Sequence, residues 1–175
     1  PRIGPQREVK KALEAYWGDK ISAEELLKVA KEQRLNTYAT IKEQGVDFVP
    51  TGTFSLYDHV LDASNTFGVV PEAYAKSGLS PLDTYFAMAR GHQKGGVDLP
   101  ATEMKKWFDS NYHYLVPEFS EKSEFKLNNT KPVDEFVEAK EAGYNARPVV
   151  VGPITLLWLG KVSKDCLLYT SLMAR

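Results

Sequence analysis

Apolar side chains recur along the first 44 residues at the spacing of helix faces. Val9 is followed by apolar residues four, seven and eight positions later, which are Leu13, Tyr16 and Trp17. This spacing places the four side chains on one face of a helix with 3.6 residues per turn. Ser22 is followed three residues later by Glu25, the pattern of a capping box that starts a second helix. This helix is predicted to continue to about Gln44, because Gly45 can adopt the left-handed conformation that ends a helix.

Farther along the chain, short apolar runs alternate with helical patterns. Strands are predicted at residues 46–50, 112–117 and 148–151. Helices are predicted from a cap at Ser55, from a cap at Ser80 to Gly91, over residues 101–108 and over residues 132–142. The last helix carries Val133, Phe136 and Val137 on one face, and polar connections are predicted at residues 91–100 and 120–131.

This alternation predicts an α/β fold. Helices between short buried strands favour right-handed crossovers and a parallel sheet, either open or closed into a barrel. In both architectures ligands bind at the carboxyl ends of the strands, which here are residues 50–53, 116–118 and 152–155.

The composition excludes several classes of protein. The 175 residues are 43% apolar, and 22 basic against 23 acidic residues leave a net charge of −1, so no overall field favours nucleic acid or a membrane surface. The longest mostly apolar run, residues 148–159, is shorter than the roughly 20 residues of a membrane-spanning helix. A single cysteine, Cys166, excludes an internal disulfide and a cysteine-rich zinc site. We expect a soluble, cytoplasmic protein.

Residues 104–119 hold the strongest candidate for a binding site, with five aromatic residues, a histidine, an asparagine and two adjacent lysines. Asn111 can bind the edge of a heterocycle or a carboxylate, and the aromatic rings can stack on a ligand. A plainer interpretation makes the aromatics and His113 part of the core, and it is the better one for the aromatics. For Lys106 and Asn111, polar residues between apolar ones, a binding role is favoured.

A second cationic cluster comes from Arg7 and Lys10 in the first turn of a helix. Two cations there oppose the helix dipole, although the free backbone amides favour an anion. The plainer interpretation is a solvated face with a pair between Glu8 and Lys11. Taken together, the two clusters predict a pocket for a flat aromatic ligand that carries negative charge.

Other catalytic signatures are absent from the sequence. It contains no glycine-rich phosphate loop, no Gly-x-Ser-x-Gly elbow and no pair of residues spaced for a metal. Asp58 and His59 place an acid beside a base, but adjacent helical residues do not face each other, so we assign Asp58 to helix capping. Cys166 has no base nearby in the sequence.

The motifs resemble the amino-terminal half of the cobalamin-independent methionine synthase family. The resemblance rests on residues 1–4, 7–10, 57–61, 106–114 and 152–161. It implies two facing (β/α)8 barrels, of which this chain would be an incomplete first part of the amino-terminal barrel, over residues 1–164. Residues 165–175 depart from the family pattern and are expected to be a foreign or disordered tail. With no initiator methionine before Pro1, we expect both ends to be truncated.

The resemblance also implies a reaction. The family transfers the methyl group of 5-methyltetrahydropteroyltri-L-glutamate to L-homocysteine, using a zinc ion in the second barrel and no cobalamin. It implies that the folate's glutamate tail binds Arg7, Glu8, Val9, Lys10, Lys106 and Asn111. Homocysteine and the zinc ligands belong to the other barrel, so this chain alone is expected to bind no catalytic zinc and to be inactive. We expect a monomer that binds neither nucleic acid nor membrane.

Three alternatives remain open from the sequence. A stand-alone folate- or pterin-binding module would bind without turnover, and a non-catalytic scaffold domain would not bind at all. A barrel like that of uroporphyrinogen decarboxylase is the nearest enzymatic alternative, but the chain lacks an evident arginine-rich amino-terminal cluster.

Overall fold

The computed structural model describes residues 3–162, which fall into two compact units. The first unit comprises Pro1–Leu56 and Lys131–Val150, and the second comprises Tyr57–Thr130 and Val151–Arg175. Both mix helices with short strands, which confirms the predicted α/β class. The strands of the described residues form four separate two-stranded pairs and no closed barrel, so the incomplete barrel over residues 1–164 stays a prediction. The expected tail at residues 165–175 lies outside the described residues.

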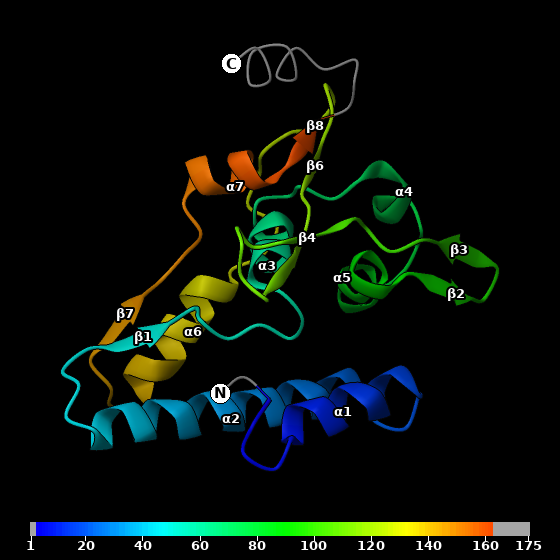
Figure 1. The fold of residues 1–175 in the computed structure, drawn as a ribbon. Coiled ribbons are helices and arrows are strands. Elements are labelled where there is room, and N and C mark those ends of the chain that lie inside the picture. The colour runs from blue at the N-terminus through cyan, green and yellow to red at the C-terminus, as the bar shows by residue number, and fades with distance from the viewer. Residues whose placement is uncertain (1–2, 163–175) are drawn as a thin grey trace. The chain divides into compact units, whose positions relative to one another are not determined.

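Two helices near the start of the first unit pack against each other. Helices α1 (Glu8–Trp17) and α2 (Ala23–Glu43) lie side by side (Figure 1). The predicted capping box is confirmed, since Glu25 N donates to Ser22 Oγ (3.2 Å) and Ser22 N donates to Glu25 Oε2 (2.7 Å). Gly45 has the predicted positive φ of 79° after the end of α2.

The strands of the first unit are parallel, as predicted, but their positions differ. Strand β1 (Val49–Thr51) pairs with β7 (Ala146–Pro148), and α6 (Lys131–Glu141) packs against both strands. Predicted strand residues such as Val46, Phe48 and Val150 are instead exposed and outside the ladder. The predicted positions of both strands are therefore wrong by a few residues. They were predicted from apolar character alone, whereas the backbone register decides which residues pair.

Helix α6 buries a different face from the one that its apolar residues suggest. Val133 and Val137 are exposed, whereas Glu135 is only 4% exposed and Ala139 is fully buried. The prediction that Val133 and Val137 lie on the buried face is wrong. Glu135 is buried instead, because cations and a backbone amide bind its carboxylate.

The second unit contains four helices and three of the four strand pairs in the described residues. Its helices are α3 (His59–Thr66), α4 (Glu72–Ala75), α5 (Pro81–Arg90) and α7 (Pro153–Leu159). Its strands are β2 (His92–Lys94), β3 (Val97–Leu99), β4 (Met104–Lys106), β5 (His113–Leu115), β6 (Glu118–Phe119) and β8 (Lys161–Val162). Their core joins residues of α3, β5, β6 and α7: Val60, Ala63, Tyr114, Phe119, Leu156 and Leu159.

Four predictions for this unit can be judged directly. The helix from Ser80 to Gly91 is confirmed, with Ser80 Oγ as cap and Pro81 first. The predicted loop at residues 91–100 is wrong, because Gly95 and Gly96 both have positive φ and turn β2 back onto β3. The predicted helix at residues 101–108 is also wrong, because that segment forms β4, antiparallel to β5. Ser55 is not a helix cap: Asp58 caps α3 through Leu61 N (2.9 Å), which confirms its capping role.

No helix among residues 3–162 is long and apolar enough to cross a membrane.

Candidate functional site

The start of α1 carries four of the six predicted binding residues. Arg7 is the N-cap residue and has a left-handed backbone, with φ 62° and ψ 34°. Such a conformation is costly for a residue with a Cβ, and residues of this kind cluster at functional sites as well as in turns. The side chains of Arg7 and Lys10 are exposed, and Lys10 makes only a surface pair with Glu14 at 3.7 Å. Both cations are therefore open to an anionic ligand.

Glu8 and Val9 have a different place in the same turn. Glu8 Oε2 accepts a hydrogen bond from Gln6 N (3.0 Å), and Val9 is only 1% exposed, with its amide bonded to Ile3 O (3.1 Å). A Cβ on Gly4, at φ 81°, would lie 2.1 Å from Glu8 Oε2. Glu8 and Val9 thus contribute to the shape of the turn, whereas the side chains of Arg7 and Lys10 are exposed.

The backbone of Arg7 provides the first prediction. Arg7→Gly is expected to raise the free energy of unfolding by about 1 kcal/mol, because glycine adopts the left-handed conformation without the Cβ penalty. The same change should weaken binding of a polyanionic ligand, because the guanidinium is lost. Urea denaturation and ligand titration of the variant test the two effects, and a loss of stability would show that Arg7 is retained for the fold.

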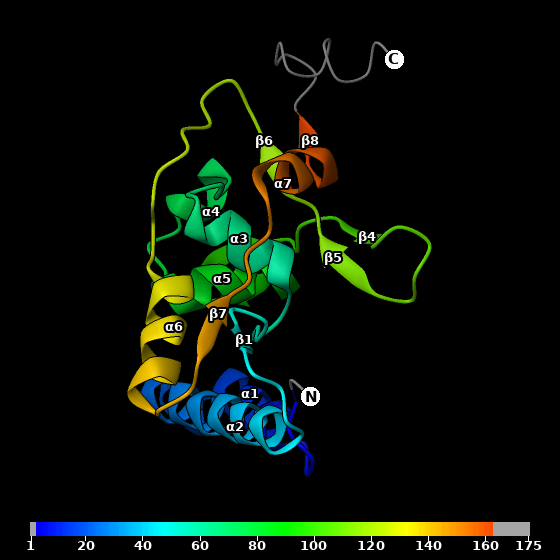
Figure 2. The same ribbon diagram turned by 90° about the vertical axis from the view of Figure 1, so that its left-hand side faces the viewer.

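The other two predicted residues belong to the hairpin of β4 and β5 in the second unit, whose connecting loop projects outward (Figure 2). Lys106 pairs with His113 in register, and Trp107 N donates to Tyr112 O (2.7 Å). Because side chains alternate along a strand, Lys106 and His113 lie on one face of the hairpin and Trp107 and Tyr112 on the other.

The outward face of this hairpin carries exposed polar side chains. Lys106 and Asn111 are exposed, and among residues 3–162 neither side chain has a hydrogen bond or an ion pair. Lys105 differs, because its ammonium lies 3.4 Å from Glu103 Oε1. Phe108, in the loop that connects β4 and β5, has a φ of 51° and is 65% exposed. The structure therefore offers one unpaired ammonium, one unpaired amide and an exposed ring.

The inward face is structural, as the plainer interpretation of the aromatics expected. Tyr114 is buried and donates to Leu159 O (3.0 Å). The His59 ring centroid lies 4.9 Å from that of Trp107 and 5.3 Å from that of Tyr112. His113, by contrast, is exposed, with Nδ1 3.2 Å from Asn111 O.

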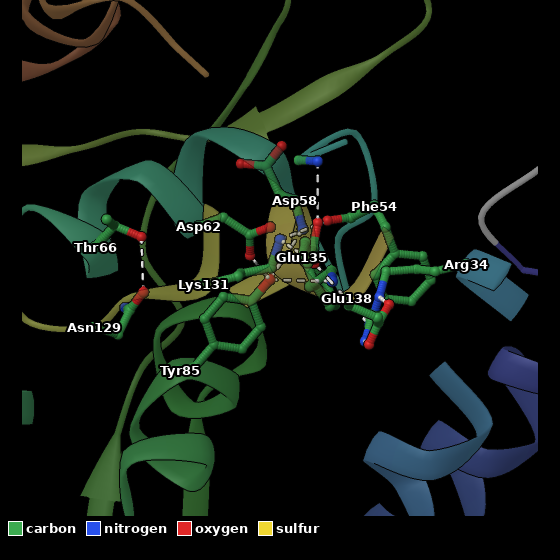
Figure 3. A network of polar contacts seen from close by, with 12 residues as sticks. Arg34, Phe54, Asp58, Asp62, Thr66, Tyr85, Asn129, Lys131, Glu135 and Glu138 are labelled. Atoms are coloured by element: carbon green, nitrogen blue, oxygen red, sulfur yellow. Dashed lines mark hydrogen bonds and ion pairs between the residues drawn. The ribbon is translucent and has the colours of Figure 1, made fainter. Parts of the chain in front are cut away.

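Asp58 links this hairpin to α3 and is a residue whose full role the sequence did not reveal. Its Oδ2 accepts from Leu61 N (2.9 Å) and Leu115 N (3.1 Å), and its Oδ1 accepts from the Tyr112 hydroxyl. Nearby in the second unit, the Tyr85 hydroxyl donates to Asp62 Oδ1 (2.7 Å), as Figure 3 shows. Burial, followed by the Asp62 charge, raises the pKa of Tyr85 well above its usual value.

Comparison with known proteins decides the family. The family described as "Cobalamin-independent synthase, N-terminal domain" matches residues 1–174. The chain belongs to this family. The name of the family supports the expected independence from cobalamin.

Similar proteins carry methyltransferase names. A Schizosaccharomyces pombe protein named "Probable 5-methyltetrahydropteroyltriglutamate--homocysteine methyltransferase" is 58% identical over 170 residues, which cover 94% of this chain and 22% of that protein. The Saccharomyces cerevisiae protein of the same name, without "probable", is 55% identical over 95% of this chain and 23% of its own length. A Flavobacterium johnsoniae relative is 51% identical over 168 residues, which cover 94% of this chain and 22% of that protein. The chain thus spans less than a quarter of the length of these relatives.

The first unit also contains a cluster of charged residues that the sequence did not predict, in which Glu135 is buried and its neighbours are partly buried. Arg34 donates to both carboxylate oxygens of Glu138, at 2.9 and 2.8 Å, and Lys131 Nζ lies 2.9 Å from Glu135 Oε1 (Figure 3). Glu135 Oε2 also accepts from Gly52 N at 3.1 Å. Burial opposes the charge of Arg34, but Glu138 and Glu135 outweigh it and raise the pKa of Arg34. Each carboxylate of the cluster therefore has a cationic partner.

The second unit also contains a cavity of about 890 Å³. Its lining mixes cations, carboxylates and amides, and includes Glu118, Lys126, Asn128 and Lys161. Lys161 is already paired with Glu118 (2.8 Å) and Glu103 (3.3 Å), and these carboxylates raise its pKa. None of the six predicted binding residues lines this cavity.

The predicted binding residues thus come from both units. Arg7, Glu8, Val9 and Lys10 belong to the first, and Lys106 and Asn111 to the second. Among residues 3–162 no three His, Cys, Asp or Glu side chains gather as a metal site would require.

Proposed function

We propose that this chain is the amino-terminal part of a cytoplasmic, monomeric methyltransferase that transfers a methyl group from 5-methyltetrahydropteroyltri-L-glutamate to L-homocysteine. In this proposal the chain is an incomplete (β/α)8 barrel that binds the glutamate tail of the folate. The names of its relatives support the reaction, since they specify the triglutamate folate and homocysteine.

The tail-binding role rests chiefly on Lys106. Its ammonium is exposed and unpaired among the described residues, while Lys105 beside it is held by Glu103. The glutamate tail presents carboxylates, and a lysine ammonium forms strong charge-assisted hydrogen bonds with carboxylates. Asn111 adds an amide that can donate to a carboxylate oxygen, and Arg7 and Lys10 are two further exposed cations.

As the family resemblance implies, we assign zinc and the activation of the homocysteine thiol, whose pKa zinc would lower, to the part of the protein outside this chain. Residues 3–162 contribute binding and orientation of the methyl donor, and we assign no catalytic residue among them.

Substitution of Lys106 tests this proposal. In a full-length synthase that carries this sequence as its amino-terminal part, Lys106→Ala should raise KM for the triglutamate folate about tenfold, the effect of losing one charge-assisted hydrogen bond. The value of kcat should change little, since the contact is made far from the transferred methyl group.

Two controls sharpen the measurement. Lys105→Ala removes a neighbouring lysine that already has an acidic partner, and it should leave KM near the parent value. The monoglutamate folate lacks the extended tail, so Lys106→Ala should raise its KM much less. An equal rise for both folates, or no rise for either, would contradict a role in tail binding.

A further inference from the structure

We propose that Tyr112 is a positioning residue: its hydroxyl, held by Asp58 and His59, fixes the β4–β5 hairpin so that the opposite face presents Lys106 and Asn111 to the ligand. The functional consequence rests on the proposed binding of the glutamate tail. The positioning itself rests on contacts within the second unit alone.

Asp58 is the fixed point of this arrangement. It is 1% exposed, and its carboxylate accepts from the amide of Leu61 in α3 and the amide of Leu115 in β5. Hydrogen bonds to a charged acceptor are about twice as strong as those between neutral groups, and they are stronger still away from water. One buried carboxylate therefore fastens the hairpin strand β5 to the start of α3.

Tyr112 extends this attachment toward the loop of the hairpin. Its hydroxyl donates to Asp58 Oδ1, and His59 Nδ1 lies 3.0 Å from the hydroxyl oxygen. A phenol has a single proton, so with that proton directed at Asp58 the contact is completed by a proton on His59 Nδ1. The His59 ring also packs against Trp107, the residue opposite Tyr112 in the hairpin. Both strands are thereby held at the point where the loop begins.

The loop beyond this point has its own internal bonds. Ser110 N and Ser110 Oγ both donate to Trp107 O, at 3.1 and 2.6 Å, and Tyr112 N donates to Ser110 Oγ (3.3 Å). A loop that is closed in this way moves as one piece, so its direction depends on the anchors at its base. Lys106 precedes Trp107 and Asn111 precedes Tyr112, which places each predicted binding residue next to an anchored ring.

Tyr112→Phe removes the anchor and keeps the ring. Opening of the hairpin can be followed without any ligand, through the rate at which trypsin cleaves the full-length protein after Lys105 and Lys106, measured by mass spectrometry. The loss of a hydrogen bond to a carboxylate should speed this cleavage about tenfold, because cleavage follows the population of the open form. Cleavage at the parent rate would overturn the positioning role.

Tyr74→Phe is the matched control. The Tyr74 hydroxyl donates to Pro100 O (2.6 Å), so this variant also loses a partly buried tyrosine hydrogen bond in the second unit, but outside the hairpin. Its cleavage after Lys105 and Lys106 should stay at the parent rate. Acceleration by both variants alike would indicate a general loss of stability and would overturn a specific role for Tyr112.

Kinetics then test what the positioning does. Tyr112→Phe should raise KM for the triglutamate folate several-fold with little change in kcat, whereas a purely structural loss would lower the amount of active enzyme and leave KM unchanged. An unchanged KM in Tyr112→Phe, when Lys106→Ala does raise it, would overturn the link between hairpin and ligand. If Lys106→Ala itself has no effect, the proposed function fails, and the cleavage assay still decides whether Tyr112 positions the hairpin.

Discussion

Replacing Glu135 by alanine is expected to lower the free energy of unfolding by about 3 kcal/mol, since it removes a buried carboxylate that compensates the partly buried cations beside it. Glu135 is 4% exposed, and it binds the Lys131 ammonium and the Gly52 amide. Arg34 lies 4.0 Å away, so the change leaves two cations and one backbone donor without this acceptor.

Urea-induced unfolding measures this loss, and Glu14→Ala is its control. Glu14 also pairs with a lysine four residues away along a helix, but that pair with Lys10 is exposed. Exposed pairs contribute about 0–1 kcal/mol, so the control should unfold almost at the parent urea concentration. Equal effects of the two substitutions would mean that the buried cluster does not stabilise the first unit.

Three helix boundaries were predictable because their signals are local. The capping box of Ser22 and Glu25, the Ser80 cap with Pro81 and the glycine after α2 all act within one turn, and all three were found as predicted. The β2–β3 hairpin was missed although Gly95 and Gly96 provided a local signal, because adjacent glycines with positive φ are typical of a tight hairpin turn. That signal could have been used.

The hydrogen-bond partners of the polar residues were not predictable in this way. Asp58 was correctly assigned to capping, but its bonds to Leu115 and Tyr112 join residues more than fifty positions apart. Glu135 lies between Val133 and Val137, and the pattern of apolar residues favoured burial of those two side chains. Long-range partners decided otherwise, since a carboxylate that is bound by cations and an amide can be buried. The binding residues came from the family resemblance, and the structure adds which of their side chains are exposed.

Gly52→Ala is expected to be as damaging as the loss of Glu135, for a reason that combines backbone strain with a steric clash. Gly52 follows β1 with a φ of 77°, and a Cβ there would lie 2.4 Å from the carbonyl oxygen of Val149. That atom belongs to the backbone, and Val149 N is bonded to Thr51 O at 2.8 Å, so it cannot move aside without disturbing the parallel pair. Strain and overpacking together should cost about 3 kcal/mol or more.

Gly45→Ala separates these two causes. Gly45 has a nearly identical φ of 79°, but a Cβ there would meet no atom within 4 Å. Its substitution should therefore cost only the conformational penalty, about 1 kcal/mol. The difference between the two variants in urea denaturation reports the clash with Val149 alone. If Gly52→Ala is no more destabilising than Gly45→Ala, the close approach of residue 52 to the end of β7 is not what requires glycine, and the strand pair has room that the structure does not show.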